Sequence, residues 1–319
     1  MDGEIDLKSV EKELKQVDDL VVAFTKGGYF KKMTEKNFKA SDKRVKDTAS
    51  AEDFFTAVAK AKSDQTLLAF TNLGNCCKID LEIAQECRFR DKGVKFNAVA
   101  KEAARNEYPV AFFAVYEDKL PEGYLLFFTK DGMIKKTEWK EYNLQKPYYQ
   151  AIKLKDKDEL ISVEDDLPGL RISYITEKGA ILVAIKDDLP VQGRVAGGVK
   201  GIKLDDKDEI KFVSQTDEEG EYVIITDSGY YKRVIVSEIE PMARYRKGVK
   251  ICQLGKDDKI VFGGYVKDVP YDIAVIDNFG VAFSVNTEEL SIEPRTGKGK
   301  TLKSVNKKRR PEFAFKVFS

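Results

Sequence analysis

The chain of 319 residues contains no histidine, so it lacks the side chain that most often acts as a general base near neutral pH. Its four cysteines (Cys76, Cys77, Cys87 and Cys252) do not have the spacing of zinc ligands. We therefore expect neither a zinc site nor a histidine-based triad, but reduced thiols with one or two in the core. Cys76 and Cys77 are adjacent in a strand-like run and should point to opposite faces of a sheet.

Long apolar runs and an excess of one charge are also missing. No stretch approaches the ~20 apolar residues of a membrane helix, and no signal-like segment opens the chain. With 55 Lys and Arg against 54 Asp and Glu, the net charge is +1, which excludes a uniformly basic surface. The carboxylates lie in runs such as "KLKDKDEL" and "KLDDKDEI", which are typical of solvated turns, so we predict no catalytic pair.

What the chain does contain is a sequence repeat. An apolar run, then Thr-x-x-Gly, then a second apolar run occurs six times, once with Asp in place of Thr. The copies are Thr25–Gly28, Thr71–Gly74, Thr129–Gly132, Thr176–Gly179, Thr226–Gly229 and Asp277–Gly280. Their glycines are 46, 58, 47, 50 and 51 residues apart, which is the spacing of propeller blades built from four-stranded sheets. The step of 58 residues predicts an insertion around residues 100–111.

Each copy has the chemistry of a β-hairpin, because a β-branched run leads into turn-forming residues and a glycine. A type I turn closed by a left-handed residue requires glycine at that place. The hairpin does not explain why cations follow the turn two to four residues later. These cations are Lys31, Lys32, Lys78, Lys135, Lys136, Lys232 and Arg233.

A second glycine lies 19 residues after the turn glycine in four copies, at Gly93, Gly198, Gly248 and Gly299. Further cations precede and follow it. They are Arg88, Arg90, Lys92 and Lys95; Arg194 and Lys200; Arg244, Arg246, Lys247 and Lys250; and Arg295, Lys298 and Lys300. The third copy has Ala151 at this place and keeps Lys153. We interpret the cations as anion contacts and the glycine as room for a ligand near the backbone. The alternative is that the lysines only protect exposed sheet edges.

The repeated Thr-x-x-Gly hairpin with its basic, glycine-containing loop resembles the C-terminal domain of the A subunits of bacterial type IIA topoisomerases, over nearly the whole chain. The resemblance implies an all-β fold, a six-bladed β-pinwheel (propeller-like) in which each blade is a four-stranded antiparallel sheet. It also implies that duplex DNA bends around a basic outer rim. The implied DNA-binding residues are the cations given above together with Lys43, Arg44 and Lys46.

The choice between topoisomerase IV and DNA gyrase depends on one segment of the sequence, residues 41–47. Gyrase A subunits carry the box Q-R-R-G-G-K-G in the loop of the first blade. Residues 41–47 here read "SDKRVKD", with three cations but neither Gln nor Gly. Fragments of the box occur at 192–198 ("QGRVAGG") and 293–299 ("EPRTGKG"). This departure favours the A subunit of topoisomerase IV and leaves gyrase as the alternative.

The resemblance implies a module of an ATP-dependent enzyme rather than an enzyme by itself. No cofactor is expected in this chain, because ATP and Mg would bind to other domains and subunits. The implied partners are duplex DNA, the breakage–reunion domain of the same polypeptide and the ATPase (B) subunit of the holoenzyme. The implied location is the cytoplasm, at the nucleoid. A protein-interaction propeller is the alternative from another class, which the single tryptophan, Trp139, disfavours because the Trp-Asp blade signature is missing.

We expect one domain over residues 1–319. The predicted blades cover about 20–65, 66–120, 121–168, 169–218, 219–268 and 269–319. Residues 1–19 form a lead-in in which "EIDL" could close the ring, or Leu7, Val10, Leu14 and Val17 could mark a short helix. Near the other end, the cations 307–310 fit either a DNA contact or a solvated loop. Phe313, Phe315 and Val317 should face inward from a last strand.

Overall fold

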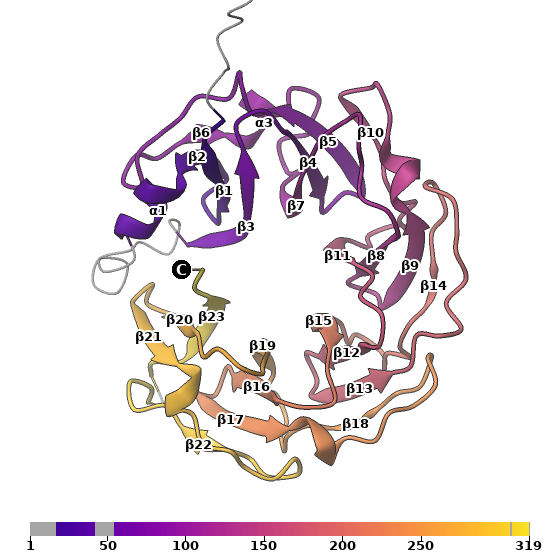
Figure 1. Cartoon of the computed structure of the whole chain (residues 1–319). Coiled ribbons are helices and arrows are strands. Elements are labelled where there is room, and N and C mark those ends of the chain that lie inside the picture. Colours follow the sequence, from indigo (N-terminus) through magenta and orange to yellow (C-terminus); the bar gives the residue numbers. More distant parts are fainter. Residues whose placement is uncertain (1–16, 42–53, 307, 319) are drawn as a thin grey trace, which may run out of the picture.

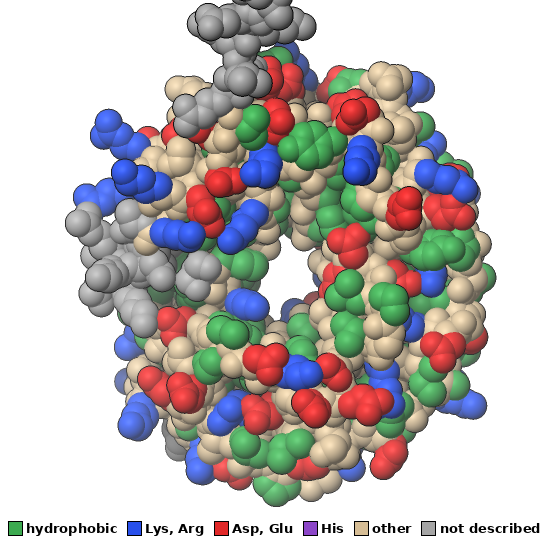
Figure 2. All heavy atoms as spheres, viewed as in Figure 1, with side chains coloured by type: hydrophobic (Ala, Val, Ile, Leu, Met, Phe, Trp, Pro, Cys, Tyr) green, Lys and Arg blue, Asp and Glu red, His purple; other side chains and the backbone are tan. Residues whose placement is uncertain are grey.

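The computed structural model describes residues 17–41, 54–306 and 308–318, which form a ring of six β-sheets (Figure 1) around a central channel that stays open when all side chains are drawn (Figure 2). Each sheet is a blade whose first two strands in sequence are the predicted hairpin, so the six-bladed prediction is confirmed. Five blades have four strands, and the sixth has three among the described residues. Within this part of the chain, no helix is both long and apolar enough to span a bilayer.

The first three blades each run from an innermost strand beside the channel to an outermost strand at the rim (Figure 1). Blade one contains β3 (Phe55–Lys62), β1 (Asp19–Thr25), β2 (Tyr29–Thr34) and β6 (Val94–Lys95). Blade two contains β7 (Pro109–Val115), β4 (Thr66–Thr71), β5 (Asn75–Asp80) and β10 (Tyr148–Gln150). Blade three contains β11 (Leu160–Asp165), β8 (Tyr124–Thr129), β9 (Met133–Glu138) and β14 (Val199–Lys200).

The other three blades follow the same order. Blade four contains β15 (Ile210–Thr216), β12 (Arg171–Thr176), β13 (Ala180–Ala184) and β18 (Val249–Lys250). Blade five contains β19 (Ile260–Val266), β16 (Glu221–Thr226), β17 (Tyr230–Ile235) and β22 (Lys300–Thr301). Blade six contains β23 (Pro311–Lys316), β20 (Asp272–Asp277) and β21 (Ala282–Asn286). The short helices of the described residues are α1 (Glu35–Ser41), α3 (Phe96–Val99), η3 (Trp139–Tyr142), η4 (Val236–Glu238) and η5 (Thr287–Glu289).

The outer strand of each four-stranded blade comes from the next repeat along the sequence. β6, for example, lies between β5 and β7 in the chain, but it pairs with β2 of blade one. β10, β14, β18 and β22 are exchanged in the same way. The blades are therefore not the contiguous segments that the sequence suggested, because every outer strand crosses the predicted boundary.

The first strand of each hairpin is apolar on both faces because it is packed between two neighbouring blades. In β8, Leu125 and Phe127 face the core shared with blade two, while Leu126 and Phe128 face the core shared with blade four. This placement explains runs such as "LLFFT", which do not alternate between apolar and polar residues. Cys76 and Cys77 of β5 likewise enter different cores, which confirms that they point to opposite faces.

The common form of the hairpin turn depends on two residues in each copy. The six turn glycines have φ between 76° and 85°, the left-handed region predicted for them. The Thr three residues before the glycine accepts a hydrogen bond from the N–H of the residue after the glycine, as in Met133 N to Thr129 Oγ1 at 3.1 Å. Asp277 Oδ1 accepts the equivalent bond from Val281 N at 2.9 Å, which explains why Asp can replace Thr in the sixth copy.

The ends of the chain correct one expectation. Phe315 and Val317 pack against Phe54 of blade one, as predicted for an inward face, but Phe313 is 42% exposed. Its ring is covered on one side by Lys26, whose Nζ lies 3.1 Å from the ring centroid. The "EIDL" strand and the possible helix at the start of the chain fall outside the described residues, except for Val17. The long step between the second and third copies is accommodated at 96–108, which includes α3, and at 116–123.

Candidate nucleic-acid interface

Four of the exchanged outer strands are preceded by a loop that crosses the outer side of the blade, and we call these loops arches. Each arch begins at a parallel bridge to the second hairpin strand and ends in the outer strand. Arch one is 86–94 on blade one, arch three is 191–199 on blade three, arch four is 242–249 on blade four, and arch five is 292–300 on blade five. The second predicted group of cations lies in or directly after these arches.

The second glycine of the four repeats that have one does not leave room for a ligand, so that interpretation is wrong. Gly198 has φ +81°, and a Cβ there would clash with the carbonyl oxygen of Ile134 in the strand beneath the arch. Gly93, Gly248 and Gly299 meet the carbonyl oxygens of Phe30, Ile181 and Tyr231 in the same manner. The glycine is needed because the backbone of the arch packs directly against the second hairpin strand of its own blade at this position.

Four of the cations that follow the hairpin turns are also corrected, because they lie inside the protein. Lys31, Lys32, Lys135 and Lys232 are at most 8% exposed. Each donates to backbone carbonyl oxygens, for example Lys32 Nζ to Leu81 O at 2.8 Å. Burial lowers the pKa of Lys135 to about 7, and the neighbouring Arg194 acts in the same direction. A side chain that is enclosed in this way cannot reach a phosphate group.

Six further candidates are half-buried and bonded to their own fold. Lys78 pairs with Glu117 at 2.6 Å, Lys136 with Asp166 at 2.6 Å, and Arg233 with Glu221 at 2.8 Å. Arg194, Arg244 and Arg295 occupy the same place in arches three, four and five. Each donates to the backbone carbonyl of the residue that ends the preceding blade's outer strand, namely Gln150, Lys200 and Lys250.

These three arginines join each arch to the outer strand of the preceding blade. Arg244 also forms a bidentate ion pair with Asp188, in which each hydrogen bond is 2.8 Å long. This contact lowers the pKa of the Asp188 carboxyl. Backbone bonds repeat the same connection, as in Lys203 N to Arg246 O at 3.0 Å and Gln253 N to Gly297 O at 3.2 Å. Hydrogen bonds therefore connect the outer segments of successive blades from blade two to blade five.

The remaining described candidates are exposed on or next to the arches. They are Arg88, Arg90, Lys92, Lys95, Lys153, Lys200, Arg246, Lys247, Lys250, Lys298 and Lys300. Some have acidic neighbours, such as Lys247 with Asp205 and Lys300 with Glu293. Figure 2 shows that acidic and basic side chains are interspersed over the viewed face, while lysine and arginine side chains project from its outer edge.

Tyrosines beside the arch lysines were not predicted from the sequence. Lys92 and Lys95 lie 4.7 and 3.9 Å from the ring centroid of Tyr29, and hydrogen bonding to them lowers the pKa of its hydroxyl. Lys298 lies 4.2 Å from Tyr230 in the equivalent place on blade five. The signal for these pairs is a tyrosine directly after the turn glycine, as in "KGGY" and "DSGY". Such rings offer a flat surface beside a cation.

Some predicted residues have no place in this interface. Lys43, Arg44 and Lys46 lie outside the described residues, as does Lys307. In the remainder of the C-terminal cluster, Arg309 pairs with the buried Asp277, and Arg310 pairs with Asp258 at 3.2 Å. These two arginines hold the loop before β23 to its neighbours.

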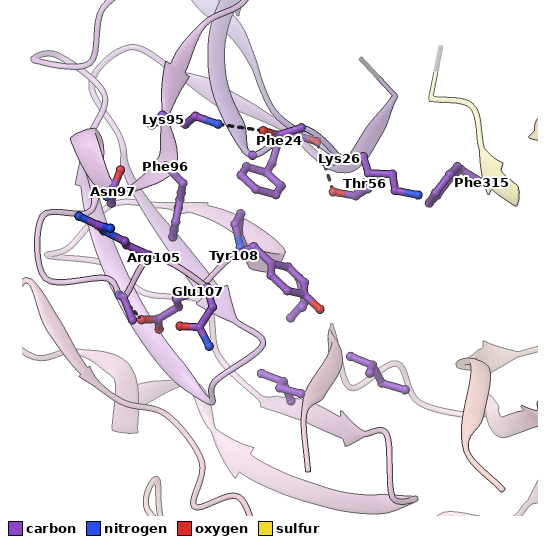
Figure 3. Close-up of a pocket in the computed structure, with 18 of the residues that line it drawn as sticks. Phe24, Lys26, Thr56, Lys95, Phe96, Asn97, Arg105, Glu107, Tyr108 and Phe315 are labelled. Carbon is purple, nitrogen blue, oxygen red and sulfur yellow. Dashed lines mark hydrogen bonds between the residues drawn. The ribbon is translucent and has the colours of Figure 1, made fainter. Parts of the chain in front are cut away.

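A cavity of about 850 Å³ opens at the turn of the first hairpin, beside the start of the innermost strands β7 and β11. Phe24, Phe96 and Tyr108 contribute its apolar walls, and Lys26 points toward Phe315 at one side (Figure 3). Arg105 lies on the opposite side of the view, and Lys95 donates to the carbonyl of Gly27 at 3.1 Å. The cavity is separate from the arches apart from Lys95.

Comparisons with known proteins bear on this geometry. The sequence profile of the family described as the DNA gyrase C-terminal domain, beta-propeller, matches residues 19–43, 123–164, 175–217 and 220–266. The A subunit of DNA topoisomerase 4 from Bacillus subtilis (strain 168) is 35% identical over 190 residues, which are 58% of this chain and 23% of that protein. The corresponding protein of Staphylococcus epidermidis is 28% identical over 211 residues, 63% of this chain and 25% of that protein. The chain thus matches about a quarter of each relative.

Two solved structures share the fold. A C-terminal domain of DNA topoisomerase IV superposes with a TM-score of 0.81 at 24% identity, over 95% of this chain and 94% of that one. A DNA gyrase A C-terminal domain superposes with a TM-score of 0.68 at 18% identity, over 94% of this chain and all of that one. At these identities the superpositions establish the ring of blades and nothing finer.

Proposed function

Because the chain belongs to the family of C-terminal domains of type IIA topoisomerase A subunits, we propose that it binds duplex DNA through the exposed cations of its arches and bends the DNA around its outer edge. In this role it presents a DNA segment for strand passage. It has no catalytic activity by itself and works with the breakage–reunion domain of the same polypeptide and with the ATPase (B) subunit of the holoenzyme. ATP and Mg would act in those other parts.

The observation that carries this proposal is the recurrence of exposed cations beside the arches of four blades. Lys95, Lys200 and Lys250 stand two residues after the glycine of arches one, three and four, and Lys298 stands directly before the glycine of arch five. Flexible lysines and single arginines suit contacts to phosphates, whereas base readout requires paired donors and acceptors in a groove. Since the net charge is only +1, attraction depends on this local arrangement rather than on the field of the whole protein.

We infer that the parent enzyme is of the topoisomerase IV type, acting in decatenation and relaxation. The window 41–47 lacks the glutamine and glycines of the gyrase box. The similar A subunits from Bacillus subtilis and Staphylococcus epidermidis are both described as topoisomerase 4. The topology of plasmid closed in the presence of the chain decides between this type and the gyrase alternative.

Duplex binding measured by fluorescence anisotropy over a range of salt concentrations tests the proposal. If Z phosphates are contacted, log K should fall against log salt with a slope of about −0.9Z, so six contacts give a slope near −5. Arg90→Glu combined with Arg246→Glu should weaken binding to all duplex sequences alike and make the slope shallower by about 2. Neither arginine has an ion pair among the described residues, so the variant should remain folded.

The matched control is Lys101→Glu combined with Lys256→Glu, which changes the net charge by the same amount at exposed positions that are not part of an arch. This control should bind almost as tightly as the wild type. Equal weakening by both pairs would mean that the general field, rather than the arches, attracts DNA. A wild-type affinity that barely changes with salt would reject phosphate binding altogether.

A further inference from the structure

Three of the buried lysines occupy one equivalent position in alternate blades. Lys31, Lys135 and Lys232 each follow their turn glycine by three residues, in blades one, three and five. In blades two, four and six the same position is Cys77, Leu182 and Phe283. Because an unpaired buried amino group is costly, three such lysines need a compensating interaction.

That interaction is with the arch above each lysine. Arch one meets β2 at Lys32 and again at Phe30, so Lys31 lies beneath the middle of the arch. Arches three and five straddle Lys135 and Lys232 in the same way, between the bridges at Lys136 and Arg233 and the ladders at Ile134 and Tyr231. Each lysine therefore extends into the concave side of a loop that comes from the next repeat.

The amino groups bind carbonyl oxygens on this concave side. Lys232 Nζ donates to Pro294, Arg295 and Gly297 at 2.7 to 2.8 Å. Lys135 Nζ donates to Arg194 O and to Ala151 O at 2.6 Å, and Lys31 Nζ donates to Phe89 O at 2.8 Å. Apart from Ala151 O, which follows β10 of blade two, these carbonyls belong to residues of the arches that carry or adjoin a cation. Directing the carbonyls inward leaves the opposite side of the arch for cationic side chains.

We propose that Lys31, Lys135 and Lys232 are positioning residues for DNA binding, which hold arches one, three and five in the shape that presents their cations, without touching DNA themselves. The inference rests on the proposed DNA-binding function. In this role the three lysines affect DNA binding indirectly and do not contact phosphate groups. The exposed lysines and arginines attract DNA, while the buried lysines fix the positions of these exposed side chains.

Arch four provides an internal comparison. Leu182 lies beneath it in place of a lysine, and the arch is held instead by the ion pair between Arg244 and Asp188 and by the bond from Arg244 to Lys200 O. The lysine is therefore one of two ways to fix an arch. Where the lysine is present, the inner carbonyls lose their donor if it is replaced by an apolar side chain.

The test replaces each lysine by methionine, which keeps the length of the apolar stem and removes the amino group. Lys135→Met and Lys232→Met are compared with Leu182→Met, which places the same side chain beneath arch four without removing a donor. Two quantities are measured well below the melting temperature. One is the affinity for duplex DNA, and the other is amide hydrogen exchange in residues 191–199, 242–249 and 292–300.

We expect each lysine variant to bind DNA roughly five- to tenfold more weakly, in line with the loss of hydrogen bonds from a charged donor. Exchange should become faster in the arch above the replaced lysine and stay unchanged in the other arch. Leu182→Met should alter neither quantity substantially. If Lys135→Met does not fold, Lys31→Met and residues 86–94 provide the same test.

Three outcomes would overturn the proposal. Unchanged affinity with faster exchange would mean that arch order is irrelevant to DNA binding. Weaker affinity with unchanged exchange would mean that the lysine acts only through its charge. If neither quantity changes, the lysines do not hold the arches. A wild-type chain that binds no DNA would instead reject the proposed function, and the exchange data would still decide whether the lysines hold the arches.

Discussion

At the scale of single residues, the same side chain has opposite roles depending on its partners. Lys135 and Lys298 are both lysines close to an arch, but the first is enclosed by carbonyls and the second stands beside Tyr230 on the surface. The sequence could not separate them. The carbonyls that enclose Lys31, Lys135 and Lys232 include ones that lie 58 to 65 residues away in the chain.

The buried amino group of Lys135 predicts how stability changes with pH. Below about pH 7 both the folded and the unfolded chain carry its proton. Above that pH the folded chain releases the proton, while the unfolded chain keeps it up to the usual lysine pKa near 10.5. The unfolded state binds more protons in this window, so the free energy of unfolding should rise with pH.

The prediction is measured by urea unfolding of the wild type and Lys135→Met. Their difference in unfolding free energy should shift in favour of the wild type by about 1–3 kcal/mol between about pH 7 and pH 9.5. Using the difference removes the titration of groups common to both proteins. A difference that is constant over this range would show that Lys135 keeps its proton in the folded chain.

Gly198 allows a second prediction at this scale. Gly198→Ala should lower the free energy of unfolding by about 1–3 kcal/mol, because φ is +81° and the added methyl group clashes with Ile134 O. Gly193→Ala in the same arch is the control, since a Cβ there has open space. Thermal and urea unfolding of the two variants give the comparison. Equal stability would show that the arch can shift away from β9 at little cost.

At the scale of elements, the hairpins followed from the sequence and the outer strands did not. The turn glycine, its left-handed conformation and the flanking apolar runs are local features, so the repeat was sufficient to predict six hairpins. The outer strands are only two or three residues long and pair with a different repeat. No local pattern indicates such a partner, because the pairing is decided by how one blade packs beside the next.

The turn threonines give a prediction for the hairpin as a unit. Thr129→Val removes the acceptor for Met133 N and should lower the free energy of unfolding by about 1–2 kcal/mol. Thr129→Ser keeps the hydroxyl and should recover most of that loss. Chemical unfolding of the three proteins measures the effect. Little destabilisation by Val would show that this hydrogen bond contributes little to the hairpin.

At the scale of the whole molecule, the interface is uneven around the ring. Blades one, three, four and five carry arches, whereas blade two has the segment "QKPYYQ", whose outer strand pairs directly with β5. Arg194, Arg244 and Arg295 connect the outer edge only from blade two to blade five. DNA that follows the outer edge would therefore meet cations in an interrupted series.

This unevenness predicts the outcome of a topology experiment. Bending 20–30 base pairs by 40–90° costs on the order of 1–6 kcal/mol, and phosphate contacts must offset this cost along the whole path. With contacts missing at blade two, we expect the chain to bend duplex DNA but to leave little or no net writhe. The measurement is the linking number of relaxed plasmid closed by ligase in its presence. Strong positive writhe at modest protein-to-DNA ratios would instead favour the gyrase alternative.

The exchange of outer strands has a consequence for the time course of synthesis. β2 ends at Thr34, but β6, which completes its sheet, is about 60 residues further along the chain. At about 5–20 residues per second, blade one would wait roughly 3–12 seconds on the ribosome for its last strand. By then the hairpin of blade two has also been synthesised, and its strand β5 in turn lacks its partner β10. We therefore expect the blades to be completed in order from blade one. Throughout synthesis, the most recently made hairpin would still lack its outer strand.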